Sequence, residues 1–182
     1  MNLQNKKPYL LYVGNAFPHK NLKRLVLAFK KLKKSISNIN LILVGERDYF
    51  YKKLEKIVNK AQINNVYFVG RVSDQTLFKL YKNAKLYVFP SLEEGFGLPG
   101  LEAMKYNLPV VCSKKASLPE IYKDAAVYFN PKNTKDIYIK IFDLLNNSKK
   151  QTQLIKAGQK RVKMYSWDKC AKKTLKVYNS FN

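Results

Sequence analysis

Cysteine, histidine and long apolar runs are scarce in this chain of 182 residues. The two cysteines, Cys112 and Cys170, are far apart and lack metal-ligand spacing, so we expect free, partly buried thiols rather than a disulfide or a zinc site. The single histidine, His19, argues against a histidine metal site. The longest apolar runs, such as residues 9–13, have only strand length, and the amino terminus lacks the apolar core of a signal peptide. We therefore expect a cytoplasmic protein without a bound metal.

Acidic residues are also scarce. The chain has 35 Lys plus Arg against 12 Asp plus Glu, which gives a formal net charge of +23. Such a charge permits nucleic acid, an anionic membrane surface or phosphorylated ligands as partners. Only four of the basic residues are arginine, which base recognition favours, so we expect no specific nucleic acid. The alternative function is a basic module that binds nucleic acid or an anionic membrane surface without catalysis.

Glycine and proline are few, at 7 each, and the composition is neither disordered nor fibrous. Short apolar runs alternate with segments whose apolar residues recur at helical spacing, and no hairpin signal joins two runs. This alternation predicts a doubly wound α/β fold with a six-stranded parallel sheet. One helix is expected over residues 101–106, and three more should end the chain, the last beginning near Ser166 and Trp167. The strands are expected at residues 9–14, 40–45, 66–70, 85–89, 109–112 and 126–129.

Two connections differ from the rest. They are residues 14–21, after the first strand, and residues 90–100, after the fourth. In a doubly wound sheet of order 3-2-1-4-5-6 the first and fourth strands are neighbours, and ligands bind where the loops at their carboxyl ends diverge. We therefore expect the two connections to lie face to face, with a ligand between them.

The second connection contains Gly95, Gly97 and Gly100 just before a helix. Glycine permits close approach of the backbone to a ligand, and free amides at a helix N-terminus attract phosphate. Glu94 and Glu102 flank these glycines, and a carboxylate accepts hydrogen bonds from hydroxyl groups. The segment thus places amides that can bind phosphate between carboxylates that can bind hydroxyls. This suggests a ligand that contains both phosphate and hydroxyl groups, such as a sugar nucleotide.

Other residues at the same edge suit such a ligand. Lys20, near the start of the first helix, is placed to neutralise a diphosphate, and Asn21 is expected to cap that helix. Asn15 either bonds phosphate or stabilises the turn after the first strand. Arg71 and Val72, after the third strand, are placed to form a wall for a flat base.

A complete catalytic group is not recognisable. Ser91 lacks a plausible histidine partner, and no nucleophile, general base and orienting residue occur together. The residues predict binding rather than a self-sufficient catalytic site.

At these residues the sequence resembles the C-terminal, donor-binding domain of the retaining GT-B glycosyltransferases of family 4. The resemblance covers nearly the whole chain, from Tyr9 to the closing segment Tyr165-Ser-Trp-Asp. Its most specific element is Glu94-Gly-Phe-Gly-Leu-Pro-Gly-Leu-Glu102, which is similar to the family's E-x7-E signature. Residues 70–74, 89–91 and 117–120 match shorter family segments in the expected order.

The resemblance implies metal-independent transfer of a hexose from a nucleotide-diphosphate sugar to an acceptor, with retention of configuration. The resemblance implies no cofactor besides this co-substrate. The catalytic residue would be Glu94, which holds the transferred sugar, and Glu102 would bind the ribose hydroxyls. Lys20 would bind the diphosphate, whereas the family usually has a second cation, an arginine, at the position of Asn15. The backbone at Phe96, Gly97 and Leu98 would also hold the sugar and adjoining phosphate, and Arg71 and Val72 would contact the nucleobase.

A full GT-B enzyme also has a preceding Rossmann-like domain that supplies most of the acceptor site. We therefore expect residues 1–8 to be the remnant of an interdomain linker and residues 9–182 to be the donor-binding domain, inactive without an N-terminal domain in cis or in trans. The chain would be an excised fragment or a separate subunit, and the apolar face of its final helix would be exposed or repacked. The excess charge suggests peripheral contact with the anionic inner face of a membrane.

Overall fold

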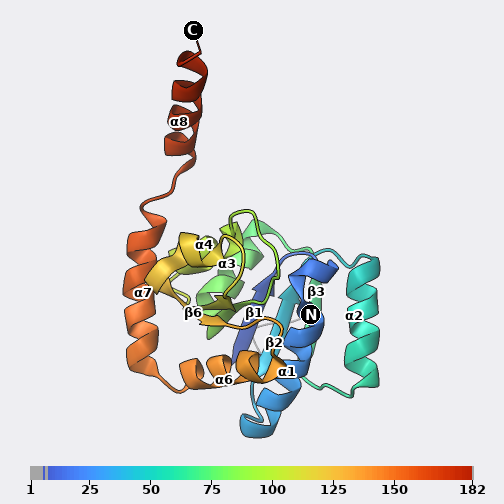
Figure 1. Ribbon diagram of the computed structural model, residues 1–182. Helices are drawn as coiled ribbons and strands as arrows, with labels where there is room; N and C mark the ends of the chain where they lie inside the picture. The colour runs from blue at the N-terminus through green and yellow to red at the C-terminus, as the bar shows by residue number, and fades with distance from the viewer. Residues whose placement is uncertain (1–5, 7, 182) are drawn as a thin grey trace.

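The structure is a computed structural model that describes residue 6 and residues 8–181 (Figure 1). Its sheet has the order β3-β2-β1-β4-β5-β6, and all neighbouring strands are parallel. This is the predicted doubly wound topology. The predicted linker remnant, residues 1–8, falls almost entirely outside the described residues. The strands are β1 (Tyr9–Val13), β2 (Asn40–Val44), β3 (Val66–Gly70), β4 (Leu86–Phe89), β5 (Val110–Ser113) and β6 (Ala126–Phe129).

Helices connect the strands and cover both faces of the sheet (Figure 1). Helix α1 packs against α6, and α4 packs against α7. The segments are η2 (Pro18–Lys20), α1 (Leu22–Ser35), α2 (Tyr49–Lys60), α3 (Asp74–Asn83), α4 (Leu98–Lys105), α5 (Leu118–Tyr122), η3 (Lys123–Ala125), α6 (Thr134–Leu145), α7 (Ser148–Val162) and α8 (Trp167–Asn179).

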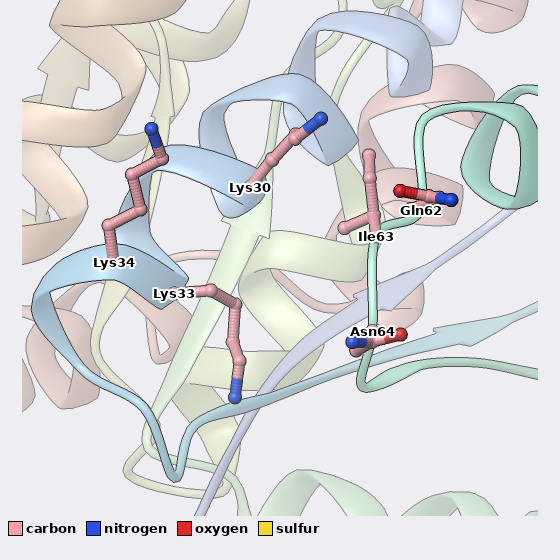
Figure 2. Close-up of a pocket in the computed structure, with 6 residues that line it drawn as sticks. All are labelled: Lys30, Lys33, Lys34, Gln62, Ile63 and Asn64. Carbon is pink, nitrogen blue, oxygen red and sulfur yellow. The ribbon is translucent and has the colours of Figure 1, made fainter.

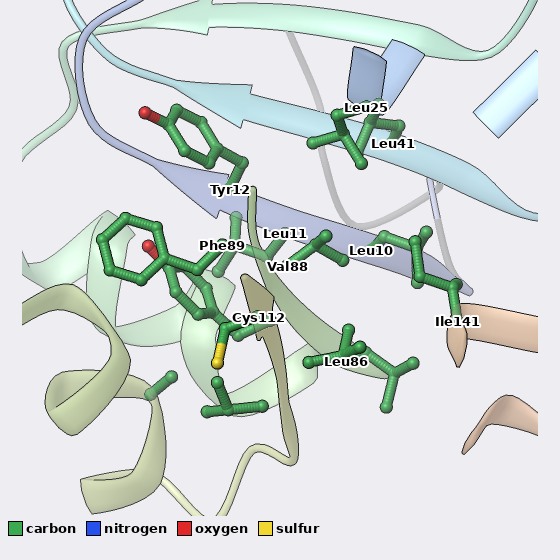
Figure 3. Close-up of a cluster of buried hydrophobic side chains, with 14 of the residues drawn as sticks. Leu10, Leu11, Tyr12, Leu25, Leu41, Leu86, Val88, Phe89, Cys112 and Ile141 are labelled. Carbon is green, nitrogen blue, oxygen red and sulfur yellow. The ribbon is translucent and has the colours of Figure 1, made fainter. Parts of the chain in front are cut away.

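The central strands form the core because both of their faces are covered. Every residue of β2, β4 and β5 is buried, which explains why these strands read as continuous apolar runs rather than as alternating patterns. Figure 3 shows side chains of β1, β4 and β5 packed together with Leu25 of α1 and Ile141 of α6. The core therefore joins the sheet to its covering helices.

The starts of α3 and α1 differ in their capping. The Ser73 side chain accepts a hydrogen bond from the Thr76 amide, as the N-cap of α3. Asn21 precedes α1 as predicted, but its side chain makes no cap hydrogen bond and its backbone is left-handed, with φ 60°. Helix α4 starts at Leu98 rather than at the expected Leu101, because Gly97 ends the preceding loop in a left-handed conformation.

Helix α8 differs from the others because none of its residues is buried. It extends away from the body of the domain (Figure 1). Trp167 is 78% exposed and Tyr178 is 68% exposed, so the helix presents large aromatic side chains to solvent. Of the two alternatives expected for the apolar face of this helix, exposed or repacked, the structure shows the exposed one.

Both cysteines are free thiols, as predicted, although Cys112 is fully buried and Cys170 is exposed. Burial raises the pKa of the Cys112 thiol well above its usual value, so this thiol stays protonated. Across the residues that the structure describes, no helix has both the length and the apolarity needed to cross a membrane.

Candidate functional site

The two unusual connections meet at the carboxyl edge of the sheet. Strands β1 and β4 are paired, with Leu10 opposite Leu86, so the loops that follow them begin side by side. The Leu92 amide donates a hydrogen bond to the His19 carbonyl, N to O 2.7 Å, which joins the two loops. Between them lies a hollow of about 510 Å³, lined by His19, Lys20, Glu93, Glu94, Gly95 and Ala116. We call this hollow the crevice; it lies where the topology predicts a ligand.

Lys20 and Glu94 meet directly inside the crevice. The Lys20 Nζ donates to the Glu94 Oε1 at 2.7 Å, and their side chains are only 17% and 10% exposed. Partial burial makes this contact stronger than an ion pair on the open surface. Lys20, predicted to bind a diphosphate, and Glu94, predicted to bind a sugar, are therefore close enough to contact the same ligand.

Glycine shapes the loop that carries Glu94. Gly97 has φ 92°, and a β-carbon there would overlap the hydroxyl of Tyr122 and lie 2.6 Å from Leu118. The Tyr122 hydroxyl donates to the Gly97 carbonyl, and the Ser117 hydroxyl donates to the Glu94 carbonyl at 3.0 Å. The loop is thus fixed from beneath by residues that follow β5. At the start of α4, Pro99 has no amide hydrogen, and the Gly100 amide donates to the Gly97 carbonyl at 3.1 Å.

Glu102 lies on the exposed side of α4. Its Oε2 accepts a hydrogen bond from the Tyr81 hydroxyl of α3 at 3.0 Å. Burial, followed by the neighbouring Glu102 carboxylate, raises the pKa of Tyr81 well above its usual value, so the hydroxyl remains a donor. One carboxylate oxygen is therefore fixed by Tyr81, and the other has no hydrogen-bond partner among the described residues.

The remaining predicted residues lie around this edge. Asn15 is half-buried, and its Oδ1 accepts a long hydrogen bond from the Phe17 amide, 3.4 Å, which fits the turn-stabilising interpretation of this residue. Phe96 packs edge-on against Tyr165 with ring centroids 5.3 Å apart, and it is 38% exposed. Leu98 opens α4 and is 46% exposed.

Arg71 and Val72 follow β3 at the outer end of the sheet. Val72 packs partly against the core. The Arg71 side chain is exposed and has no hydrogen bond or ion pair with any described residue. The structure thus leaves both residues accessible at the same edge, but it draws neither into direct contact with Lys20 or Glu94.

Asn21 has a role that the sequence did not predict. Its Nδ2 donates to the carbonyls of Pro90 and Pro131, both at 2.9 Å, and the residue is only 4% exposed. These bonds hold the loop of Lys20 against the loops after β4 and β6. The sequence signal was ambiguous, because an asparagine before a helix is typical of an N-cap.

A second hollow lies at the opposite, amino edge of the sheet, where α1 ends and β3 begins. It measures about 200 Å³ and is lined by Lys30, Lys33, Lys34, Gln62, Ile63 and Asn64. We call it the lysine hollow. Figure 2 shows that the three ammonium groups point in different directions, so they do not converge on a common point.

Two of these lysines donate hydrogen bonds to the protein's own backbone. The Lys30 Nζ donates to the Ala61 carbonyl at 2.8 Å, and the Lys33 Nζ donates to the carbonyls of Ser37 and Ile39. Carbonyls at the ends of helices need such donors. No group of three or more acidic, histidine or cysteine side chains that could hold a metal ion occurs in the described part of the chain.

Comparison with known proteins identifies one family for most of the chain. Residues 1–161 match the family described as glycosyl transferases group 1. The curated protein named O-antigen chain mannosyltransferase B from Escherichia coli is 34% identical over 172 residues, which is 93% of this chain but 45% of that protein. The chain thus spans about half the length of this relative.

Solved structures give the same result for the fold. The C-terminal domain of the glycosyl transferase group 1 family protein LpcC from Francisella tularensis is 28% identical, with a TM-score of 0.75, and the match covers 88% of this chain and 89% of that one. Anabaena HepE, solved in complex with UDP and glucose, has a TM-score of 0.83 at 19% identity, and the match covers 94% of this chain and 48% of that one. The fold is the Rossmann-like half of a GT-B protein.

Proposed function

The chain belongs to the glycosyl transferases group 1 family, and from that premise we propose that it is the donor-binding half of a glycosyltransferase. The donor would be a nucleotide-diphosphate sugar, bound in the crevice between the loops after β1 and β4. The single observation that carries this proposal is the Lys20–Glu94 contact, because it brings a diphosphate cation and a sugar-binding carboxylate together at one edge. HepE, with the same fold, was solved with UDP and glucose, which supports a donor of this class.

Each crevice residue has a proposed task. Lys20 binds the diphosphate, and Glu102 accepts hydrogen bonds from the ribose hydroxyls with its free oxygen. Glu94 holds the transferred sugar as the catalytic residue, together with the backbone at Phe96, Gly97 and Leu98. The base lies toward Arg71 and Val72, and Asn15 borders the diphosphate.

The proposed reaction breaks the bond between the anomeric carbon of the sugar and a diphosphate oxygen and joins that carbon to an acceptor hydroxyl oxygen, whose proton passes to the leaving diphosphate. Negative charge grows on the leaving diphosphate, so the Lys20 ammonium and the backbone at Phe96, Gly97 and Leu98, at the positive end of the α4 dipole, stabilise the transition state more than the ground state. We propose that the Lys20 ammonium and backbone amides provide this stabilisation, in a metal-independent transfer that retains configuration. No cofactor besides the donor is required by this scheme.

The acceptor would be bound elsewhere. The curated relative is about twice as long as this chain, which supports an N-terminal Rossmann-like domain as partner, in cis or in trans. We propose that the described half binds the donor but transfers no sugar until that domain completes the site. Its contact would also cover α8, whose aromatic side chains are exposed here.

The location of the protein is a separate proposal. The charge of +23 would draw a cytoplasmic enzyme toward an anionic membrane surface, as a peripheral contact. Sedimentation with anionic vesicles at low and high salt tests this idea. Binding that is absent, or that does not fall with salt, would remove it.

A calorimetric screen of UDP-, GDP- and ADP-sugars tests the donor proposal. We expect saturable binding of one equivalent of at least one of these donors. Absence of binding by all three, in protein whose circular dichroism shows a folded α/β domain, would contradict the proposal.

A further inference from the structure

Three buried tyrosines lie beneath the loop after β1. Their hydroxyls donate to three successive carbonyls: Tyr87 to Val13 at 3.2 Å, Tyr51 to Gly14 at 2.8 Å and Tyr12 to Asn15 at 2.7 Å. All three side chains are fully buried and come from different elements, β4, α2 and β1. Figure 3 shows the Tyr12 ring beside β1, with its hydroxyl directed toward the end of the strand.

Two glycines make room for these hydroxyls. A β-carbon on Gly14 would lie 2.8 Å from the Tyr12 hydroxyl, and Gly14 has φ 147°. A β-carbon on Gly45 would overlap the Gly14 carbonyl and lie 2.6 Å from the Tyr51 hydroxyl. The close approach of tyrosine and loop therefore depends on both glycines.

The tyrosines also set the direction of the loop's amides. In a planar trans peptide the N–H points opposite to the carbonyl. Because the Gly14 and Asn15 carbonyls point down to Tyr51 and Tyr12, the amides of Asn15 and Ala16 point away from the core. Neither amide has an acceptor among the described residues.

The peptide between Val13 and Gly14, which Tyr87 contacts, behaves differently. The Val13 carbonyl accepts from Tyr87, but the amide of the same peptide, that of Gly14, donates to the Val44 carbonyl at 2.9 Å. This amide is used within the sheet and is not available to a ligand. Tyr87 therefore provides an internal comparison for the other two tyrosines.

We propose that Tyr12 and Tyr51 are positioning residues for the donor's diphosphate: they hold the amides of Asn15 and Ala16 toward it, on the side where Lys20 lies. Consecutive outward amides form the kind of concavity that binds phosphate oxygens. The inference rests on the donor-binding function proposed above. It also explains how the diphosphate could be bound with Asn15 at the position where the resemblance implies an arginine. The backbone amides would supply part of the contact that the arginine makes.

The tyrosine hydroxyls keep their protons under ordinary conditions. Burial raises the pKa of both Tyr12 and Tyr51, and for Tyr12 the neighbouring Tyr51 and Glu94 raise it further. The two groups therefore act as permanent donors to the loop, and the orientation of its amides does not change with physiological pH.

The test replaces single hydroxyls. Tyr12→Phe and Tyr51→Phe each remove one bond to the loop, whereas Tyr87→Phe removes the same kind of bond from the peptide whose amide is already used. Calorimetry with UDP and GDP should show binding that is about fivefold weaker for the first two variants, from the loss of one oriented hydrogen bond, and unchanged for Tyr87→Phe. Urea denaturation measures the stability of all three variants separately.

The amide resonances of Asn15 and Ala16 distinguish positioning from a general loss of stability. In the wild-type protein we expect both to move downfield when UDP or GDP is added, and in Tyr51→Phe we expect a smaller displacement at saturation. Equal affinities for all three variants, or amides at 15 and 16 that do not move in a wild-type protein that binds nucleotide, would overturn the inference while the donor function stands. A folded wild-type protein that binds none of UDP, GDP and ADP would overturn both.

Discussion

The crevice and the lysine hollow are both depressions that contain lysine, but they use it differently. In the crevice, Lys20 faces Glu94 from another loop across 74 positions of sequence. In the lysine hollow, Lys30 and Lys33 donate to carbonyls at the ends of neighbouring segments. The crevice holds about 510 Å³ and the lysine hollow about 200 Å³.

The difference shows that the number of charges does not define a site in this protein. In the lysine hollow the three ammonium groups diverge (Figure 2), and those of Lys30 and Lys33 donate to the protein's own backbone, which leaves little for a ligand. One lysine that converges with a carboxylate, outward amides and a glycine loop offers a ligand several contacts at once. The net charge of +23 is therefore a property of the whole surface, and the proposed function depends on a few of its residues.

The largest expected effect comes from Gly97→Ala, which would deform the crevice. The new methyl group would overlap the Tyr122 hydroxyl at a left-handed φ, so we expect the free energy of unfolding to fall by about 3 kcal/mol and nucleotide binding to be lost. Gly95→Ala is the matched control, because no atom lies within 4 Å of its β-carbon position. Urea denaturation that finds the two variants equally stable would contradict the account of this loop.

Glu102→Ala should leave the fold intact and weaken nucleotide binding by about 2 kcal/mol, through the loss of charge-assisted hydrogen bonds to the ribose. Asp143→Ala removes an exposed carboxylate from α6, far along the chain, and should bind nucleotide as the wild type does. Calorimetry on the two variants compares them directly. Equal affinities would remove Glu102 from the site.

Lys20→Ala should weaken nucleotide binding by about 1 kcal/mol. The effect is smaller than for Glu102 because the ammonium must exchange its contact with Glu94 for one with the diphosphate. Lys34→Ala removes an exposed lysine from the lysine hollow and should leave the affinity unchanged. A similar loss in both variants would mean that general charge, rather than the crevice, attracts the nucleotide.

The smallest effect is expected for Lys33→Ala. Its Nζ donates to carbonyls after α1, so we expect the free energy of unfolding to fall by about 0.5 kcal/mol, with no change in nucleotide binding. Urea denaturation and calorimetry measure the two quantities. Weaker nucleotide binding in this variant would show that the lysine hollow belongs to the site.

The sequence alone predicts the order of elements and the place of the site. The strands buried on both faces, β2, β4 and β5, read as continuous apolar runs. The partly buried edge strands, β3 and β6, were also predicted at the residues where they occur. The parallel topology then brings residues 14–21 and 90–100 together. These predictions succeed because they depend only on the local hydrophobic pattern and on the strand order of a doubly wound sheet, which places the loops after the first and fourth strands side by side.

Long-range side-chain contacts could not be predicted in the same way. The bonds from Asn21 to Pro90 and Pro131, and from Tyr51 to Gly14, join residues whose separation in sequence carries no signal. The start of α4 was placed three residues late, because a glycine-rich segment gives no helical periodicity. The residues that position the crevice were therefore visible only in the structure.

The salt dependence of nucleoside diphosphate binding tests the central claim most directly. Calorimetric titration of UDP and GDP from 50 to 500 mM salt should give, for the one that binds, a slope of log K against log salt near −1, because one lysine meets the diphosphate. Binding should persist at high salt and be about 30-fold weaker in Glu102→Ala. A steep slope of several units that is the same in Glu102→Ala would contradict the account and favour a basic surface without a specific site.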